Sequence, residues 1–563
     1  MKLIKILSTV LIFSGVILLS CDSRGAKKET VLETYDYSIF PQGTILSGKM
    51  NNGATLYLIR ENPVDMEGFC FVDKDRAVVE KISFFTDSTG TTIFNNTYSG
   101  KMTMDSVSLE IEITFPEIPE LEIESQTIRM NCFGNISEKT DCPERYKDTV
   151  FDNFTVEKDI QYGTALGYYT SKPSDYISKD GYRHWFNEMF NLSVENRGFM
   201  FKNSMKQLPL LLDVYQPEND PVKKRPLVLY IHGGAFFFGD KENKSQQVLT
   251  DYVVKRGFMV ASINYRLGTS ITPGSIERAI YRDVQDARAA LRYLVHHKEK
   301  YGIDVDQIYL AGNSAGGIIS LKTAFMGSDD VYSSAGRGLF NRRENLGSLD
   351  DSGNNLTDSF KIAGVVSMWG GVTNLQMLNN HIPTLLFHGT ADNVIPCTEG
   401  LPFKEAMGDR IYRFLSSFGK IYGSEMIHDH LKSINVPVTY IPFENAGHDP
   451  QIEPDDSLNE IINLICYDMG DFLYDNVVKH YFNHNLSGNT TVSKSDFTPL
   501  YQLDNLENSK VNWHVEGGFI ISQTNSSIRV VWCSSHDTGT VTACITDANG
   551  VSHRKELNVK IKM

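Results

Sequence analysis

A serine in this chain lies in a pattern that could make it a nucleophile, Gly312-Asn313-Ser314-Ala315-Gly316. An apolar run, 308–311, precedes the pattern and two isoleucines follow it, which predicts a strand, a sharp turn and a helix. Glycines on both sides of the serine remove the Cβ atoms that would collide where strand and helix approach, so a strained turn can expose the hydroxyl. We predict that Ser314 is a catalytic nucleophile on such a turn.

A G-x-S-x-G pattern arises by chance in roughly one chain in five of this length, so the prediction depends on a base and an acid elsewhere. Two side chains follow Ser314 in the order Ser, Asp, His that this kind of turn uses. Asp392 comes shortly after the apolar run 384–387, and His448 follows the run 436–441. We predict that Asp392 orients His448 and that His448 takes the proton of Ser314. Two other histidines, His232 and His388, each follow an apolar run and are expected to have structural roles.

Backbone N–H groups for an oxyanion hole are available after another apolar run, 227–231, where the sequence reads His232-Gly233-Gly234-Ala235. Glycines let a substrate oxygen approach the backbone, and the residue after the nucleophile supplies a further N–H. We predict that Gly233, Gly234 and Ala315 form this hole. The set predicts acyl transfer to serine and then attack by water, which requires no cofactor. The sequence has no C-x-x-C pair or His/Cys cluster that suggests a metal site.

The elements that must position these residues alternate between strand and helix. Over 154–480, apolar runs such as 227–231, 258–263 and 363–368 are separated by segments with helical spacing, for example 276–294. Strands of this kind are buried on both faces, which predicts an α/β domain with a mostly parallel central sheet covered by helices. Ligands bind such sheets at the carboxyl ends of the strands.

Five segments taken together resemble a known family. They are Ile231-His232-Gly233-Gly234-Ala235, Asn264-Tyr265-Arg266-Leu267, Tyr301-Gly302-Ile303-Asp304, Gly312-Asn313-Ser314-Ala315-Gly316-Gly317 and Met368-Trp369-Gly370. They resemble the α/β-hydrolase carboxylesterases, and most of all the bacterial esterases and lipases that include feruloyl and acetyl-xylan esterases. The likeness covers roughly 155–475 and implies an α/β-hydrolase fold. It also implies a serine esterase that acts on small esters or on acetyl or feruloyl esters of polysaccharides. Ala235 departs from the third glycine of many relatives, which bears on substrate fit.

The regions on either side of 154–480 have the alternating pattern of strands. Period-2 runs such as 106–113, broken by Gly, Asn, Asp and Pro, predict a β-rich accessory domain within 22–153. Short strands with two tryptophans predict a β-sandwich over 497–563, which resembles immunoglobulin-like or PKD-like modules. The polar stretch 483–496, between the catalytic domain and the β-sandwich, is expected to be a linker. We therefore expect that a chain ending near Tyr481 folds and is active.

The first 21 residues have the features of a secretory signal: lysines at the start, then an apolar stretch. The ending Leu18-Leu19-Ser20-Cys21 resembles a bacterial lipobox, which implies acylation of Cys21 and a membrane-anchored lipoprotein of the cell envelope. An ordinary signal peptide that ends near a cysteine is the alternative.

The net charge of −15 argues against nucleic acid as a partner. With Cys21 assigned to lipid, seven of the eight cysteines remain, and export would permit disulfides. The closest pairs in sequence are Cys132 with Cys142 and Cys533 with Cys544.

Two other functions fit parts of this pattern. A serine peptidase of the same fold would share the triad, but no long propeller repeat precedes the catalytic domain. A non-catalytic, hydrolase-like binding protein would be expected to lack the nucleophile, and Ser314, Asp392 and His448 are all present. The expected function is therefore that of a serine carboxylic ester hydrolase.

Overall fold

The computed structural model of the chain describes residues 44–562, apart from gaps. The longest gaps are 171–204, 403–418, 337–343, 269–274, 105–110, 118–123 and 136–141, and shorter ones interrupt the first 100 residues and the last 70 or so. The chain divides into two compact units between Ile136 and Ser137. Cys21 and the predicted signal segment lie outside the described residues.

The first unit contains a closed barrel of eight strands. Each strand pairs antiparallel with the next, and β1 pairs with β8 to close the barrel, with Thr44 opposite Asn135. Alternation decides which side chains enter the core: Ile111 and Ile113 are buried and Glu112 between them is exposed. The strands are β1 (Thr44–Lys49), β2 (Thr55–Arg60), β3 (Met66–Lys74), β4 (Ala77–Thr86), β5 (Thr91–Phe94), β6 (Tyr98–Met104), β7 (Ile111–Phe115) and β8 (Gln126–Asn135).

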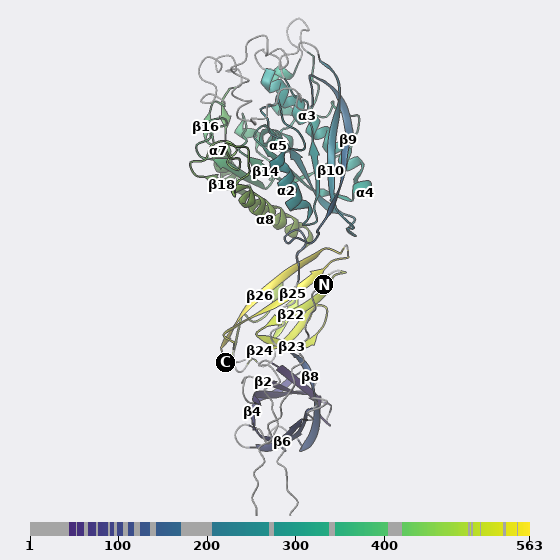
Figure 1. Ribbon diagram of the computed structural model, residues 1–563, viewed down its shortest axis with the longest axis vertical. Helices are drawn as coiled ribbons and strands as arrows, with labels where there is room; N and C mark the ends of the chain where they lie inside the picture. The colour runs from purple at the N-terminus through teal and green to yellow at the C-terminus, as the bar shows by residue number, and fades with distance from the viewer. Residues whose placement is uncertain are drawn as a thin grey trace, which may run out of the picture. The chain divides into compact units, whose positions relative to one another are not determined.

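The second unit is built on an eight-stranded mixed sheet with the order β18-β15-β14-β13-β11-β12-β10-β9 (Figure 1). All strands from β12 to β18 in this order are parallel, and β10 and β9 join antiparallel at one edge. The predicted mostly parallel sheet is therefore present. Its strands are β9 (Phe154–Gly167), β10 (Lys206–Pro217), β11 (Arg225–Ile231), β12 (Met259–Ile263), β13 (Ile303–Asn313), β14 (Ile362–Met368), β15 (Thr384–Gly389) and β18 (Val438–Phe443).

Helices cover both faces of this sheet because its strands are apolar on both sides. In β11, Leu227, Leu229 and Ile231 belong to the core under α3, α5 and α7, whereas Val228 and Tyr230 belong to the core under α2 and α8. No helix in the described part of the chain has both the length and the apolar character needed to cross a membrane. The helices are α2 (Lys244–Val254), α3 (Ser275–His296), α4 (Lys298–Tyr301), α5 (Ala315–Phe325), α7 (Ser424–Ser433) and α8 (Ile461–Tyr481); β16 (Glu399–Gly400) and β17 (Ile421–Tyr422) form a separate small ribbon.

After α8 the chain forms two four-stranded sheets around a common core that contains Trp513 and Trp532. Two short strands, β19 and β20, lie inside the stretch that the sequence suggested as a linker, and β20 pairs with β26 through a buried Val492. Leu486 and Val492 lie six residues apart among polar side chains, so the sequence of this stretch shows no strand period. The strands are β19 (Leu486–Ser487), β20 (Thr491–Ser493), β21 (Leu500–Leu503), β22 (Lys510–Glu516), β23 (Gly518–Gln523), β24 (Ser527–Trp532), β25 (Thr538–Thr546) and β26 (Ser552–Lys562).

These strands are bonded to the rest of the second unit. A disulfide joins Cys142 to Cys544, so neither cysteine takes the partner nearest in sequence that we expected. The Glu144 carboxylate is buried and accepts hydrogen bonds from the Arg554 N–H at 2.9 Å and from the Tyr474 hydroxyl at 2.6 Å. A chain that ends near Tyr481 would lose the disulfide and the Arg554 contacts, so we now expect it to be less stable than the full chain.

Loss of this disulfide should lower the stability of the full chain. It closes a loop of 402 residues, and constraint of the unfolded chain by such a loop contributes about 3 kcal/mol or more. The double variant Cys142→Ser/Cys544→Ser should therefore melt well below the wild type under oxidising conditions. Wild-type protein in excess reductant provides the control and should melt like the variant. Equal melting temperatures for oxidised wild type and variant would contradict the prediction.

Candidate active site

Ser314 lies on a sharp turn between β13 and α5, as the sequence predicts. β13 ends at Asn313, α5 begins at Ala315, and Ser314 has a φ of 55°. The turn depends on both flanking glycines. A Cβ on Gly312 would lie 2.4 Å from the Gly316 carbonyl oxygen, and one on Gly316 would lie 2.0 Å from the Ile231 carbonyl oxygen. Any side chain there would push the helix away from the sheet.

The three side chains predicted as nucleophile, base and acid meet at the carboxyl ends of the strands. His448 Nε2 lies 2.9 Å from Ser314 Oγ, and His448 Nδ1 lies 2.7 Å from Asp392 Oδ2. With the proton on Nδ1 donated to the carboxylate, Nε2 is free to accept from the serine hydroxyl. Ser314 and Asp392 are both buried, which strengthens the electrostatic interactions among the three groups.

The Asp392 carboxylate is held in place from the side opposite His448. Its Oδ1 accepts from the N–H groups of Val394 at 2.8 Å and Ile395 at 3.0 Å. Burial alone would raise the pKa of this carboxyl, but the positive charge that His448 can carry and hydrogen bonds from His388 and His448 outweigh it. The pKa of Asp392 is therefore held well below its usual range, and the group stays an anion.

His388 supports the acid, in agreement with its expected structural role. Its Nε2 lies 3.2 Å from Asp392 Oδ2 and 2.9 Å from the Ile395 carbonyl oxygen. Its Nδ1 lies 2.8 Å from Ser424 Oγ, the first residue of α7. Ser424 belongs to no sequence motif, so its part in this chain of contacts could be found only in three dimensions.

The loops that carry Asp392 and His448 are fixed to each other. Ala391 N–H donates to the Ala446 carbonyl oxygen at 2.9 Å. The glycine that this contact requires is Gly389, because a Cβ there would lie 2.3 Å from the Gly447 carbonyl oxygen. The sequence suggests that Gly447 gives this loop the room to bring the imidazole to Ser314, but a Cβ on Gly447 would meet no atom within 4 Å, so space does not require glycine there.

One of the three N–H groups predicted to form an oxyanion hole already has an acceptor in the structure. The Gly233 N–H already donates to Asn313 Oδ1 at 3.0 Å, so it is not free to bind a substrate oxygen. The N–H groups of Gly234, Ala235 and Ala315 have no acceptor among the described residues. Gly234 has a φ of 125°, and a Cβ there would lie 1.9 Å from the Phe238 carbonyl oxygen, so this position requires glycine.

His232 is a structural residue of the same loop. Its ring stacks on Tyr265 with 4.3 Å between ring centroids, and the Tyr265 hydroxyl donates to the His232 carbonyl oxygen at 2.9 Å. Burial disfavours the charged imidazole and lowers the pKa of His232 to about 4. The ring is therefore neutral at pH 7 and fixes the start of the loop without adding charge beside the nucleophile.

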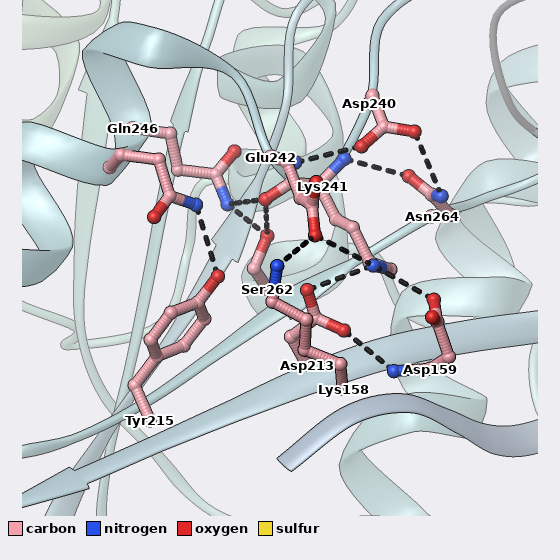
Figure 2. Close-up of polar contacts among 11 residues, drawn as sticks. Lys158, Asp159, Asp213, Tyr215, Asp240, Lys241, Glu242, Gln246, Ser262 and Asn264 are labelled. Carbon is pink, nitrogen blue, oxygen red and sulfur yellow. Dashed lines mark hydrogen bonds and ion pairs between the residues drawn. The ribbon is translucent and has the colours of Figure 1, made fainter. Parts of the chain in front are cut away.

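The far end of the loop is anchored by Lys241, a residue that the sequence analysis did not single out. Figure 2 shows its ammonium between two carboxylates, at 2.8 Å from Asp213 Oδ2 and 3.0 Å from Asp159 Oδ1. Its backbone N–H donates to Asn264 Oδ1 at 2.8 Å, and its carbonyl oxygen accepts from Ser262 Oγ at 2.8 Å. The sequence around Lys241 contains no pattern that would indicate this anchoring role.

Asn313 joins the oxyanion loop to the nucleophile turn, so its removal should lower turnover. Asn313→Ala leaves the Gly233 N–H without an acceptor, and the lost hydrogen bond corresponds to about 1 kcal/mol, or several-fold in rate. Because the hole acts on charge in the transition state, kcat should fall while KM changes little. Steady-state kinetics on a soluble ester test this. An unchanged kcat in a variant that melts like wild type would contradict it.

The described residues contain no group of three or more His, Cys, Asp and Glu side chains arranged to hold a metal ion. The Ser314 hydroxyl, the His448 ring and the Asp392 carboxylate lie in the order that suits group transfer, with N–H groups nearby that have no acceptor among the described residues.

Comparison with known proteins finds similarity to esterases. The family model BD-FAE matches residues 212–382, which include Ser314 and the glycine loop but not Asp392 or His448. A probable isoprenylcysteine alpha-carbonyl methylesterase of Arabidopsis thaliana is 30% identical over 223 residues, or 35% of this chain and 44% of that protein. Esterase LipI of Mycobacterium tuberculosis is 33% identical over 113 residues, or 20% of this chain and 33% of that protein. This chain thus spans less than half the length of either relative.

Among solved structures, a truncated carbohydrate esterase from gut microbiota aligns with 58% of this chain and 98% of its own, at 18% identity and a TM-score of 0.35. The family match and the named relatives support an esterase family of the α/β-hydrolase type for the part of the chain that they cover.

Proposed function

We propose that this protein is a serine carboxylic ester hydrolase that works through an acyl-enzyme. The observation that carries the proposal is the continuous chain of contacts from Ser314 Oγ through His448 to Asp392, with distances of 2.9 and 2.7 Å. In the proposal, Ser314 Oγ gives up the proton, His448 accepts it, and Asp392 stabilises the charge that His448 then carries. The esterase names of the two relatives add support from outside the structure.

In the proposed reaction, Ser314 Oγ attacks the ester carbonyl carbon while its proton passes to His448 Nε2. The carbonyl oxygen becomes an oxyanion that accepts from the free N–H groups of Gly234, Ala235 and Ala315. Asp392 stays ionised and stabilises the imidazolium. When the tetrahedral intermediate collapses, the C–O bond breaks and the alcohol leaves with the proton from His448. Water, deprotonated by His448, then attacks the acyl-enzyme. The bond between the acyl carbon and Ser314 Oγ breaks, Oγ takes the proton back from His448, and a carboxylic acid is released.

The N–H donors should contribute more than the chain's charged groups to the stabilisation of the oxyanion. They are fixed by the backbone before the substrate arrives, so they need not reorganise during the reaction. Ala235 enters this proposal in place of Gly233, because its N–H has no acceptor in the part of the chain that the structure describes. Its methyl group also stands where many relatives have a hydrogen, so it narrows the space beside the carbonyl oxygen and bears on the acyl groups that fit.

The substrate and the location of the protein remain proposals that depend on sequence resemblance. Acetyl or feruloyl esters of polysaccharides are the substrates that the resemblance implies. Export and a lipid anchor at Cys21 follow from residues 1–21, which lie outside the described part of the chain. The excess of acidic side chains argues against nucleic acid as a partner.

Hydrolysis assays with the full mature chain test the proposal. We expect release of p-nitrophenol from short p-nitrophenyl esters, together with labelling of Ser314 by a fluorophosphonate that can be located by peptide mass spectrometry. Acetylated xylan and feruloyl esters then separate the proposed substrate classes. Cleavage of peptide substrates in preference to esters would identify a peptidase instead, and the absence of both hydrolysis and labelling would rule out a serine hydrolase.

A further inference from the structure

Two lysines have buried side chains among the residues that the structure describes, Lys241 at 4% and Lys322 at 2% exposure. A buried ammonium is stable only if nearby groups replace the water that it has lost, and a carboxylate is the usual replacement. Lys241 has that arrangement in full: Figure 2 shows Asp213 and Asp159 on its ammonium, at 2.8 and 3.0 Å. Lys322 lacks it.

Lys322 lies two turns along α5 from the nucleophile, and the contacts of its ammonium with the described residues are to uncharged groups. Its Nζ lies 3.2 Å from Thr373 Oγ1, 3.9 Å from Met377 Sδ and 5.0 Å from the centre of the Tyr332 ring. No carboxylate of the described residues lies within 4.0 Å of it. An ammonium has three N–H donors, a hydroxyl can accept one well, and a thioether accepts weakly. At least one donor is therefore left for another acceptor.

The side chain of Lys322 borders a cavity of about 610 Å³. That volume is in the range of sites for small organic molecules. Apolar and aromatic groups make up much of the wall beside the ammonium, namely Met326, Met377, Tyr332 and Tyr422. Thr373 and Asn374 add uncharged polar groups to the same wall. Such a cavity offers one buried cation and an apolar surface next to it.

Three acidic residues also border the cavity, but each already has a local partner. Glu277 accepts from Ser334 Oγ at 2.8 Å, Asp330 accepts from the Gly327 N–H at 3.0 Å, and Asp329 accepts from Ser328 Oγ at 3.3 Å. Their negative charge disfavours phosphate and other ligands with more than one charge. A ligand with a single carboxylate keeps the attraction to Lys322 and limits this repulsion.

We propose that this cavity binds a small organic monocarboxylate. The carboxylate accepts hydrogen bonds from Lys322 Nζ and the Thr373 hydroxyl, and an aromatic or short aliphatic body packs against the methionines and tyrosines. The site is separate from the catalytic serine, because eight residues of helix place Lys322 about 12 Å from Ser314 along α5. The proposal does not rest on esterase activity, and binding can be measured without any turnover.

Calorimetric titration of the full chain with benzoate tests the site, with benzamide as an uncharged ligand of the same shape. We expect benzoate to bind and benzamide to bind at least tenfold more weakly. Lys322→Met should weaken benzoate binding at least tenfold. It should melt no lower than wild type, since it removes a buried charge that has no counter-charge. Lys420→Met is the matched control, because Lys420 borders the same cavity but is exposed and paired with Glu399, and it should bind as wild type does.

A second variant keeps the test decisive if Lys322→Met does not fold. Thr373→Val preserves shape, removes the hydroxyl beside the ammonium and should weaken benzoate binding several-fold. A carboxylate could also bind beside Ser314, so a complex with 4-bromobenzoate should show the bromine in the Lys322 cavity by anomalous scattering. Equal affinity of wild type and Lys322→Met, bromine only beside Ser314, or no binding of benzoate at tens of millimolar would each overturn the proposal.

Discussion

Ser314→Ala is expected to lower kcat on a soluble ester by a factor on the order of 10⁶. The substitution removes only the hydroxyl group, whose oxygen lies 2.9 Å from His448 Nε2. The fold should not suffer, because Ser314 is the residue before α5 and its side chain makes no capping hydrogen bond. Steady-state kinetics and thermal melts of wild type and variant, measured on the same preparation, test both halves of this prediction.

Ser320→Ala is a matched control for this variant. Ser320 lies on the same helix and is fully buried, and its hydroxyl has no hydrogen-bond partner within the described residues. Removal of that hydroxyl should leave turnover near the wild-type value. If Ser314→Ala and Ser320→Ala were equally active, Ser314 would not be the nucleophile. If both were inactive and unstable, the loss would come from packing in α5 and not from chemistry.

The parts of this site that the sequence predicts all follow a strong local pattern. Ser314 and Asp392 each come after a continuous apolar run, and such runs are strands because a parallel sheet buries both faces. His448 follows an edge strand, β18, whose side chains are half-buried or exposed. Once the strands are placed, their carboxyl ends fall on one edge of the sheet. The three side chains then have to be close, and the observed distances agree with that expectation.

The parts that could not be predicted depend on contacts between distant residues. The Gly233 N–H donates a hydrogen bond to Asn313 Oδ1, 80 residues away, and nothing in the sequence around either residue indicates this contact. The disulfide joins cysteines 402 residues apart, so nearness in sequence was the wrong guide to pairing. The buried Lys322 lies in a helix that is otherwise uncharged, and only the structure shows that no carboxylate of the described residues pairs with it.

Asp392→Asn should lower kcat by a factor on the order of 10⁴ while KM changes little. An amide at this position can still accept from the Val394 and Ile395 N–H groups through one oxygen, so the loop should stay folded. Its NH₂ group would then face His448 Nδ1, which must accept instead of donate. The proton would move to Nε2, and the base could no longer take the proton of Ser314.

The pH dependence separates this explanation from simple disruption of the site. An anionic Asp392 stabilises the positive charge on the imidazole of His448, so its loss should move the acidic limb of kcat/KM to lower pH. Asp449→Asn is the control, since Asp449 is the next residue after His448 and is as buried as Asp392, at 8% exposure each. It should leave both kcat and the pH profile near wild type. A larger loss in Asp449→Asn than in Asp392→Asn would show that Asp449 is the acid, and an unshifted acidic limb in Asp392→Asn would show that Asp392 does not act through His448.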